Sequence, residues 1–244
     1  MKQKTIKTTF VMLLIFAAAG SSARATTKDR KAEKVMNDYV SVIGGKTALS
    51  GIQNLVSQSE LKFIESVISI DREITETSGN EYYIKVSSPR IGEIIRGSDG
   101  HTCWEKRQSA VKPIEGEEKR RFLNSSYFLR YANWENHLTD YKYEGKVIID
   151  GAEMSKIAVT TNYGYKETWY FNNDSHYLAQ TEEPLDLPEG ISTVTTTFAD
   201  YKDVGGIKLP FTHIIKMPGQ TRIISFAEIK ANQVVENTIF SLPK

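Results

Sequence analysis

The chain has 244 residues, with 31 basic and 30 acidic side chains and a single cysteine. This near-neutral balance lacks the basic excess of a nucleic-acid-binding protein, so we expect no nucleic-acid partner. One cysteine cannot form an internal disulfide, so the stability of the fold must come from an ordinary apolar core.

Residues 1–25 have the layout of a secretory signal peptide. Three lysines stand within the first seven positions, residues 10–19 form an unbroken apolar run, and Ala23 and Ala25 fit an A-x-A cleavage site. The alternative of an uncleaved anchor helix is disfavoured, because the apolar run is shorter than the roughly 20 residues of a membrane span. No cysteine stands at the cleavage point to carry a lipid anchor. We therefore expect cleavage after Ala25 and a periplasmic, unanchored mature chain, residues 26–244.

The mature region reads as one domain. Because residues 1–25 hold four basic side chains and no acidic one, the remainder carries 27 basic and 30 acidic side chains. Its length suits one large β domain as well as two small ones. No Pro/Ser linker, charge block or low-complexity tract divides it, so we expect a single domain over residues 26–244.

Residues 28–44 predict an amphipathic helix. Its apolar stripe recurs at helical spacing and consists of Ala32, Val35, Met36, Tyr39, Val40 and Ile43. The pair Gly44-Gly45 ends the helix, because glycine accepts the left-handed backbone common at a helix C-terminus. A further short helical turn is expected at residues 47–51.

Strand patterns follow in the next part of the chain. Residues 52–76 are rich in β-branched side chains, and residues 80–88 alternate between two faces. Residues 90–97 and 101–108 are joined through an Asp-Gly pair, which is a strong hairpin signal. The strand pattern breaks at residue 116, and apolar side chains at mixed helical spacing predict one or two helices between residues 117 and 138.

Strands resume at residue 141 and continue toward the C-terminus. The expected segments are 141–151, 153–161, 165–172, 176–183, 191–201, 207–217 and 221–230, with turn residues between them. Together with the earlier segments they make about 10 or 11 strands at spacings of roughly 10 to 15 residues. Such regular spacing argues for antiparallel pairing, because parallel strands need crossover helices between them.

The last two predicted strands carry apolar side chains on both faces, which a sheet with one wet face does not. We infer that helices 28–44 and 117–138 cover one face of a single large, curved antiparallel sheet. The predicted fold class is α+β, an incomplete β-barrel closed by helices on its concave face. Such a half-closed barrel offers an apolar cleft to a small ligand, and the alternative is a completely filled core.

Three stretches carry a family resemblance: Tyr39–Leu55, Val147–Glu182 and Phe198–Pro243, together with the hairpin "SDGHTCWE". They resemble the LolA-like outer-membrane lipoprotein-sorting proteins over most of the mature chain. The shared motifs are turns and apolar strands rather than a catalytic fingerprint. The resemblance implies a periplasmic half-barrel with an apolar cavity that shelters acyl chains and carries lipidated proteins to the outer membrane. No arginine of this sequence is matched to a cargo-binding arginine of that family.

The sequence shows no spacing typical of a catalytic or metal site. The four histidines lie far apart, and no G-x-S-x-G elbow is present. We expect His213 to be a core histidine rather than a metal ligand, and Cys103 to be a buried inert thiol rather than a nucleophile. Residues 182–189 are expected to form a solvated acidic loop. The alternative is that this loop binds calcium or a basic partner. We expect no cofactor, no bound metal and no enzyme activity.

Aromatic side chains are the best candidates for lining a lipid-binding cavity, although each one alone is more often a packed core residue. The candidates are Phe63, Tyr82, Trp104, Phe122, Phe128, Trp134, Trp169, Phe211 and Phe226.

The first functional hypothesis is a periplasmic carrier that binds lipoprotein acyl chains or lipids in its cavity for transport to the outer membrane. We expect it to be a monomer that meets partner proteins of the inner and outer membranes. The alternative is a periplasmic sensor or binding module of the same fold that interacts with a protein partner. A hydrolase with an unrecognised site is a third hypothesis, which no group of residues supports. Transfer of cargo to an acceptor membrane separates the first hypothesis from the second.

Overall fold

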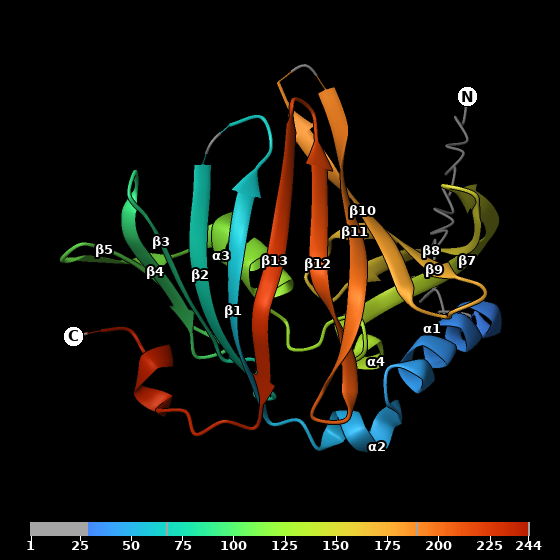
Figure 1. Ribbon diagram of the computed structural model, residues 1–244, viewed down its shortest axis with the longest axis horizontal. Coiled ribbons are helices and arrows are strands. Elements are labelled where there is room, and N and C mark those ends of the chain that lie inside the picture. The colour runs from blue at the N-terminus through green and yellow to red at the C-terminus, as the bar shows by residue number, and fades with distance from the viewer. Residues whose placement is uncertain (1–28, 67, 189, 244) are drawn as a thin grey trace, which may run out of the picture.

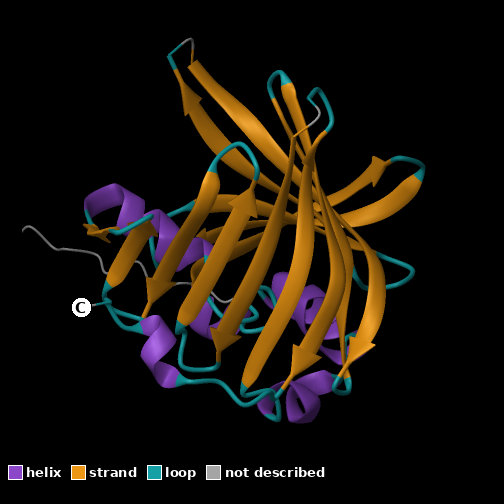
Figure 2. Ribbon diagram, turned by 60° about the vertical axis from the view of Figure 1, so that its left-hand side comes forward, coloured by secondary structure: helices purple, strands orange, loops and turns teal. Residues whose placement is uncertain are grey.

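One antiparallel sheet dominates the computed structural model, which describes residues 29–66, 68–188 and 190–243. Within these residues the sheet has 13 strands in the order β6-β5-β4-β3-β2-β1-β13-β12-β11-β10-β9-β8-β7. The strands curve around a concave side, and the edge strands β6 and β7 do not pair, so the barrel stays open (Figure 1, Figure 2). The expected signal peptide, residues 1–25, lies outside the described residues.

The strands are β1 (Asn54–Phe63), β2 (Ile68–Thr77), β3 (Tyr82–Ser88), β4 (Gly92–Ser98), β5 (Cys103–Arg107), β6 (Ala110–Ile114), β7 (Leu138–Ile149), β8 (Ala152–Thr161), β9 (Lys166–Asn172), β10 (Leu178–Leu187), β11 (Gly190–Val204), β12 (Ile207–Met217) and β13 (Gln220–Ala231). The helices are α1 (Arg30–Val42), α2 (Gly45–Ser50), α3 (Gly116–Ser125), α4 (Trp134–His137) and the 3₁₀ helix η1 (Asn237–Phe240).

The chain builds the sheet as two meanders that meet at β1 and β13. Strands β1 to β6 pair consecutively toward one edge, and strands β7 to β13 pair consecutively from the other edge back to β1. Because β6 and β7 lie at opposite edges, residues 115–137 must pass across the open side of the barrel. This crossing segment (residues 115–137) contains α3 and α4, which Figure 1 shows behind the strands.

Helix α1 lies near β7 and β9. The Asp29 carboxylate caps it by accepting hydrogen bonds from the backbone N–H groups of Lys31 (3.0 Å) and Ala32 (3.2 Å). The same carboxylate accepts a third hydrogen bond from the Tyr143 N–H of β7 (2.9 Å), which fixes the helix to the sheet. Its buried side confirms the predicted apolar stripe and consists of Ala32, Met36, Tyr39, Val40 and Ile43.

The number of strands differs from the expected 10 or 11. Residues 52–76, expected as one stretch, form the two strands β1 and β2, and β6 was not among the expected strands. Pro113 cannot donate a ladder hydrogen bond, and it is tolerated in β6 because that strand is short and lies at a sheet edge. The expectation of an acidic loop at residues 182–189 is also wrong for most of these residues, because residues 182–187 belong to strand β10. Strand β10 continues to Leu187, whose ladder partner is Gly190, so the two strands form a long hairpin.

The prediction of helices between residues 117 and 138 holds for α3 and α4, but the chain between them is not helical. Leu129 has a φ of 46°, a left-handed backbone conformation that interrupts a helix. The Phe128 N–H donates to the Asn80 side-chain oxygen (3.0 Å), which replaces a helical hydrogen bond with one to the β2–β3 turn. In the part of the chain that the structure describes, no helix combines the length and hydropathy needed to cross a membrane.

Candidate functional site

An apolar cavity of about 400 Å³ lies between the concave face of the sheet and the helical side of the molecule. Tyr39 and Ile43 from α1 and its C-cap line one side, together with crossing-segment residues Ser125, Tyr127 and 129–132. The apolar lining from the sheet consists of Leu55, Ile74, Leu178, Phe198, Leu209, Ile215, Ile224, Phe226 and Ile229. The volume falls within the roughly 300–1,000 Å³ of small-ligand sites, so the barrel is not completely filled.

Tyr131 of the crossing segment packs into the concave face. Its ring meets the edges of Trp169 (centroids 5.1 Å apart) and Phe198 (5.4 Å). Edge-to-face pairs of this kind stabilise a packed position beyond the area that they bury. The crossing segment therefore forms one wall of the cavity through defined aromatic contacts.

A buried ion-pair network holds the same segment to the sheet. The Arg130 Nη2 atom lies 2.7 Å from Glu167 Oε2 on β9 and 3.0 Å from Glu183 Oε1 on β10. The Trp169 indole N–H also donates to Glu167 (2.8 Å), and Asn124 of α3 donates to its other oxygen (3.3 Å). Burial alone would lower the pKa of Arg130, but the two carboxylates and the neighbouring Tyr131 raise it. Arg130 is therefore charged and closely paired.

Most of the polar side chains that line the cavity are uncharged at neutral pH, and the two arginines Arg72 and Arg130 are the charged exceptions. Burial raises the pKa of Glu76 to about 7. Burial and the nearby Arg72 lower the pKa of His213 to about 4. Burial also raises the pKa of Tyr82 to about 12. A cavity whose lining is mainly aliphatic, aromatic and neutral polar suits a ligand that is mainly apolar.

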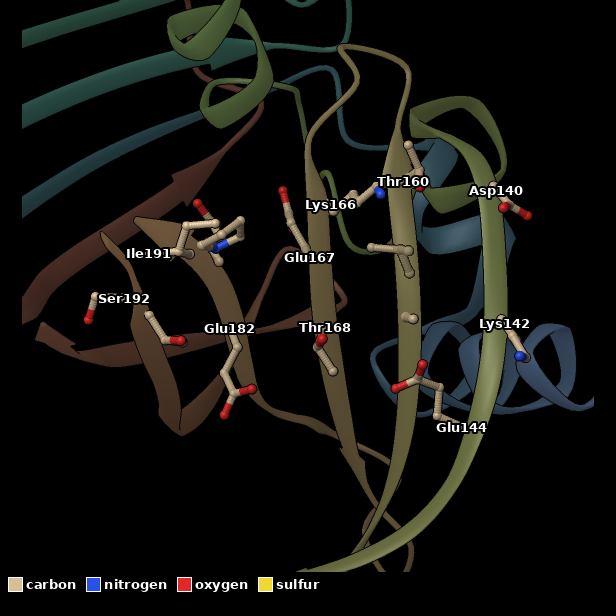
Figure 3. A pocket seen from close by; sticks show the side chains of 15 residues that line it. Asp140, Lys142, Glu144, Thr160, Lys166, Glu167, Thr168, Glu182, Ile191 and Ser192 are labelled. Carbon is tan, nitrogen blue, oxygen red and sulfur yellow. The ribbon is translucent and has the colours of Figure 1, made fainter. Parts of the chain in front are cut away.

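A second hollow, of about 450 Å³, lies over strands β7 to β11 and has a different character (Figure 3). Charged side chains of both signs line it, among them Asp140, Lys142, Glu144, Lys166 and Glu182. Most of these side chains are exposed, so an apolar ligand in this hollow would lie against solvated charges. The apolar cavity is therefore the better candidate for a functional site.

The structure places four of the nine aromatic candidates at or beside the cavity. Tyr82 and Phe226 line it directly. Phe122 packs edge-on against Tyr82 (centroids 5.6 Å apart), and Phe211 packs against Phe226 (6.4 Å). The latter two therefore support lining residues without lining the cavity themselves.

The other five candidates do not line the cavity, although Trp169 packs against the lining residue Tyr131. Phe128 and Trp134 line a separate hollow of about 360 Å³ next to α2. Trp169 is fully buried under Tyr131, and Trp104 donates its indole N–H to the Phe240 carbonyl (2.9 Å). Phe63 lies beneath the Arg222 guanidinium, 5.2 Å from its ring centroid. Whether any of the nine binds lipid stays a prediction.

Several lining residues were not expected from the sequence. Arg72 and Glu76 line the cavity beside Ile74, and Tyr131 and Tyr201 close it from other elements. A usable signal was present for the first two, because alternation in β2 places residues 72, 74 and 76 on one face. Charged residues that share a face with a buried isoleucine indicate a polar group inside a cleft.

The two residues weighed for chemistry have clear positions. Cys103 is buried, its thiol lies 3.5 Å from the Ser98 hydroxyl, and burial raises its pKa, which confirms the expected buried thiol. His213 lies between the rings of Phe198 (4.9 Å) and Phe226 (5.2 Å) and lines the cavity. Among the described residues, no cluster of His, Cys, Asp and Glu side chains could hold a metal ion.

No protein-family model matches the chain, and no curated protein matches it in sequence. Solved structures do match in fold. A DUF1329 family protein from Desulfovibrio piger has a TM-score of 0.61 at 13% identity, with 86% of this chain and 97% of that chain covered. A LolA superfamily protein from Nitrosomonas europaea has a TM-score of 0.61 at 12% identity, with the same coverage.

A third structure, a domain from Vibrio parahaemolyticus named for outer membrane lipoprotein sorting, has a TM-score of 0.57 at 14% identity. The match covers 86% of this chain and 96% of that domain. Identities of 12–14% establish the fold and nothing finer. The LolA-like fold expected from the sequence is therefore confirmed, as an open curved half-barrel with short helices.

Proposed function

We propose that this protein is a periplasmic carrier, without enzyme activity, that shelters the acyl chains of a lipid or lipidated protein in its apolar cavity. The observation that carries the proposal is the cavity of about 400 Å³ between the concave face and the crossing segment. The LolA-like fold supports it, because one of the similar structures is named for lipoprotein sorting. Export through cleavage of residues 1–25 is part of the proposal.

The energetics of an acyl chain explain why such a container is useful. Each methylene group moved from water into an apolar site contributes about 0.8 kcal/mol. A chain of many methylenes therefore cannot cross an aqueous compartment at a useful rate unless a protein covers it. No bond is made or broken, so the site needs shape and apolar lining rather than catalytic groups.

The crossing segment is the element that we propose to move when cargo enters. It forms the wall opposite the sheet, and it is attached to the sheet through side chains rather than through a strand ladder. The thirteen strands are tied together by their ladder, whereas the crossing segment can separate once the Arg130 ion pairs, the Phe128–Asn80 hydrogen bond and the Tyr131 ring contacts break.

The direct test is uptake of a fluorescent fatty acid by the mature protein, residues 26–244. Ser57 lines the cavity and is 7% exposed, so Ser57→Phe fills space that an acyl chain would occupy. We expect saturable uptake by the unmodified protein and at least a tenfold weaker uptake by the variant. The control is Gln58→Phe, on the opposite, exposed face of the same strand, which should bind normally.

Transfer of the bound probe to acceptor vesicles then separates a carrier from a sensor. A carrier delivers the probe to the vesicles, and a sensor keeps it or binds only a protein partner. Absence of uptake by the unmodified protein would contradict the proposal.

A further inference from the structure

Arg72 is a half-buried positive charge that has no acidic partner among the described residues. It lines the cavity from the middle of β2, and burial lowers its pKa, although arginine remains charged at any physiological pH. No carboxylate among the described residues lies within 4.0 Å of it, and its Nη1 atom has no hydrogen-bond partner there. Arg130, the other arginine of the cavity, pairs with two carboxylates. A guanidinium that is largely withdrawn from water, with a buried N–H group that has no partner, is unfavourable until a ligand pairs with it.

A second polar group without a partner lies directly beside Arg72. Ser59 of β1 is its ladder partner across the sheet and is 7% exposed. The Ser59 hydroxyl is buried and has no hydrogen-bond partner among the described residues. Two neighbouring strands therefore bring a guanidinium N–H and a hydroxyl, both unpaired, to the same place on the concave face.

The side chains around this pair leave it free to bind an anion. The Tyr82 hydroxyl lies within hydrogen-bonding reach of the guanidinium, whose Nη1 atom still has no partner among the described residues, and Phe226 is the ladder partner of Ser59 on the other side. His213 packs on the Phe226 ring and is neutral at physiological pH, because burial and Arg72 keep its pKa low. The nearest acidic side chain in the cavity lining is Glu76, four residues along β2, which is not paired with Arg72.

We propose that Arg72 and Ser59 form the head-group site of the cavity and bind the carboxylate or phosphate of a single-chain anionic lipid. A guanidinium presents N–H donors in the planar fork that matches both anions, and the serine hydroxyl supplies a further donor. The acyl chain then lies along the aliphatic and aromatic lining. A cavity near 400 Å³ is at the lower end of the range for small ligands, so it holds one chain better than several. This inference rests on the proposed function and names the ligand class.

The test compares three probes of equal chain length: a fatty acid, a lysophosphatidic acid and the corresponding fatty alcohol. The alcohol has the same chain and no charge. Binding is measured by displacement of a fluorescent probe from the mature protein, residues 26–244, and from its Arg72→Gln and Arg72→Lys variants. Arg90→Gln makes the same change at an exposed position and serves as the control. Circular dichroism and a thermal melt verify that each variant is folded.

We expect the unmodified protein to bind at least one anionic probe roughly tenfold more tightly than the alcohol, as a charge-assisted hydrogen bond provides. In Arg72→Gln this ratio should fall to near one while alcohol binding is unchanged, and Arg72→Lys should recover part of it. The tighter of the two anions identifies a carboxylate or a phosphate. Equal binding of acid and alcohol, or a ratio that survives Arg72→Gln, would overturn the head-group site but leave the carrier proposal standing. Failure of every probe to bind would overturn both.

Discussion

Arg130 connects the crossing segment to two strands, and its removal tests that connection. In Arg130→Met, Glu167 keeps the N–H donors of Trp169 and Asn124 but loses its positive partner inside the protein. Because a buried carboxylate without a counter-charge is costly, we expect a loss of about 3–5 kcal/mol in the free energy of unfolding. Urea denaturation measures this loss.

The matched control for that prediction is Arg121→Met, which removes an exposed i,i+4 ion pair to Glu117 on α3 and should change stability little. The double variant Arg130→Met with Glu167→Gln should recover part of the stability, because it removes the unpaired charge. A small loss for Arg130→Met alone would show that the network contributes little.

Because of His137, we expect the free energy of unfolding to fall in acid. This side chain is fully buried, neither ring nitrogen has a partner among the described residues, and burial lowers its pKa to about 3. The unfolded chain takes up this proton near pH 6.5, whereas the folded protein does not. The stability that His137 contributes by staying neutral in the fold is therefore fully present above about pH 6.5. The free energy of unfolding then declines as pH falls from 6.5 toward 3.

The variant His137→Phe keeps the aromatic contact with Tyr127 and removes the titrating group. We expect its free energy of unfolding to fall less steeply between pH 6.5 and 4.5 than that of the unmodified protein, by up to about 1.4 kcal/mol per pH unit. Parallel pH profiles for the two proteins would contradict the assignment.

Because of Glu76, we expect the free energy of unfolding to fall as the pH rises. The folded Glu76 pKa of about 7 lies above the ordinary value of 4.5, so the folded protein retains a proton that the unfolded chain has released. The stability that Glu76 contributes is fully present below about pH 4.5, and the free energy of unfolding declines as pH rises through 7. We expect Glu76→Gln to flatten the decline in the free energy of unfolding between pH 5 and 8, measured by urea denaturation at each pH. An unchanged decline would contradict a Glu76 that keeps its proton in the folded protein.

At the scale of elements, the corner between α1 and α2 depends on Gly44. Its φ of 131° is unfavourable for other residues, and an added Cβ would lie 2.6 Å from the Gly206 carbonyl oxygen in the β11–β12 turn. The Lys208 N–H also donates to the Ile43 carbonyl (2.8 Å), so the corner is bonded to that turn. We expect Gly44→Ala to destabilise the protein more than Gly45→Ala, whose Cβ would meet no atom within 4 Å.

Thermal melting compares the two glycine variants. Both replace a glycine with positive φ, so each carries a strain of about 1–2 kcal/mol, and the contact with Gly206 is the difference between them. Equal melting temperatures would contradict a tight contact at this corner.

Elements with a strong local signal could be predicted from the sequence, and those shaped by distant contacts could not. The stripe from Ala32 to Ile43 predicts α1, because its period is set by one buried face. The left-handed Leu129 and the Asn80 contact of Phe128 are produced by the β2–β3 turn, which no local pattern in residues 126–133 reveals. Strand β6 was missed because Pro113 is acceptable only at an edge.

At the scale of the molecule, the hairpins could be predicted but the closure of the sheet could not. Asp-Gly and Pro-Gly turns in the sequence predict that neighbouring strands pair antiparallel. The pairing of β1 with β13 joins residues 55–63 to residues 222–231, and no local turn in the sequence indicates it. That pairing places the two meanders side by side and makes residues 115–137 cross the open barrel.

The candidate site was predicted only in outline for the same reason. An apolar cleft under helices follows from strands that are apolar on both faces, and Tyr82 and Phe226 were named among its candidates. Which other inward residues remain uncovered depends on where the crossing segment lies. Trp169 points inward but is covered by Tyr131, so its burial could not be predicted from alternation in β9.

The measurement that tests the carrier account most directly is native mass spectrometry of residues 26–244, purified from cells without detergent, followed by solvent extraction of the bound material. The account predicts about one acylated molecule per protein chain, and loss of that mass in the cavity-filling variant Ser57→Phe. A protein that shows only its own mass, yields no acyl compound on extraction and takes up no added fatty acid would contradict the account.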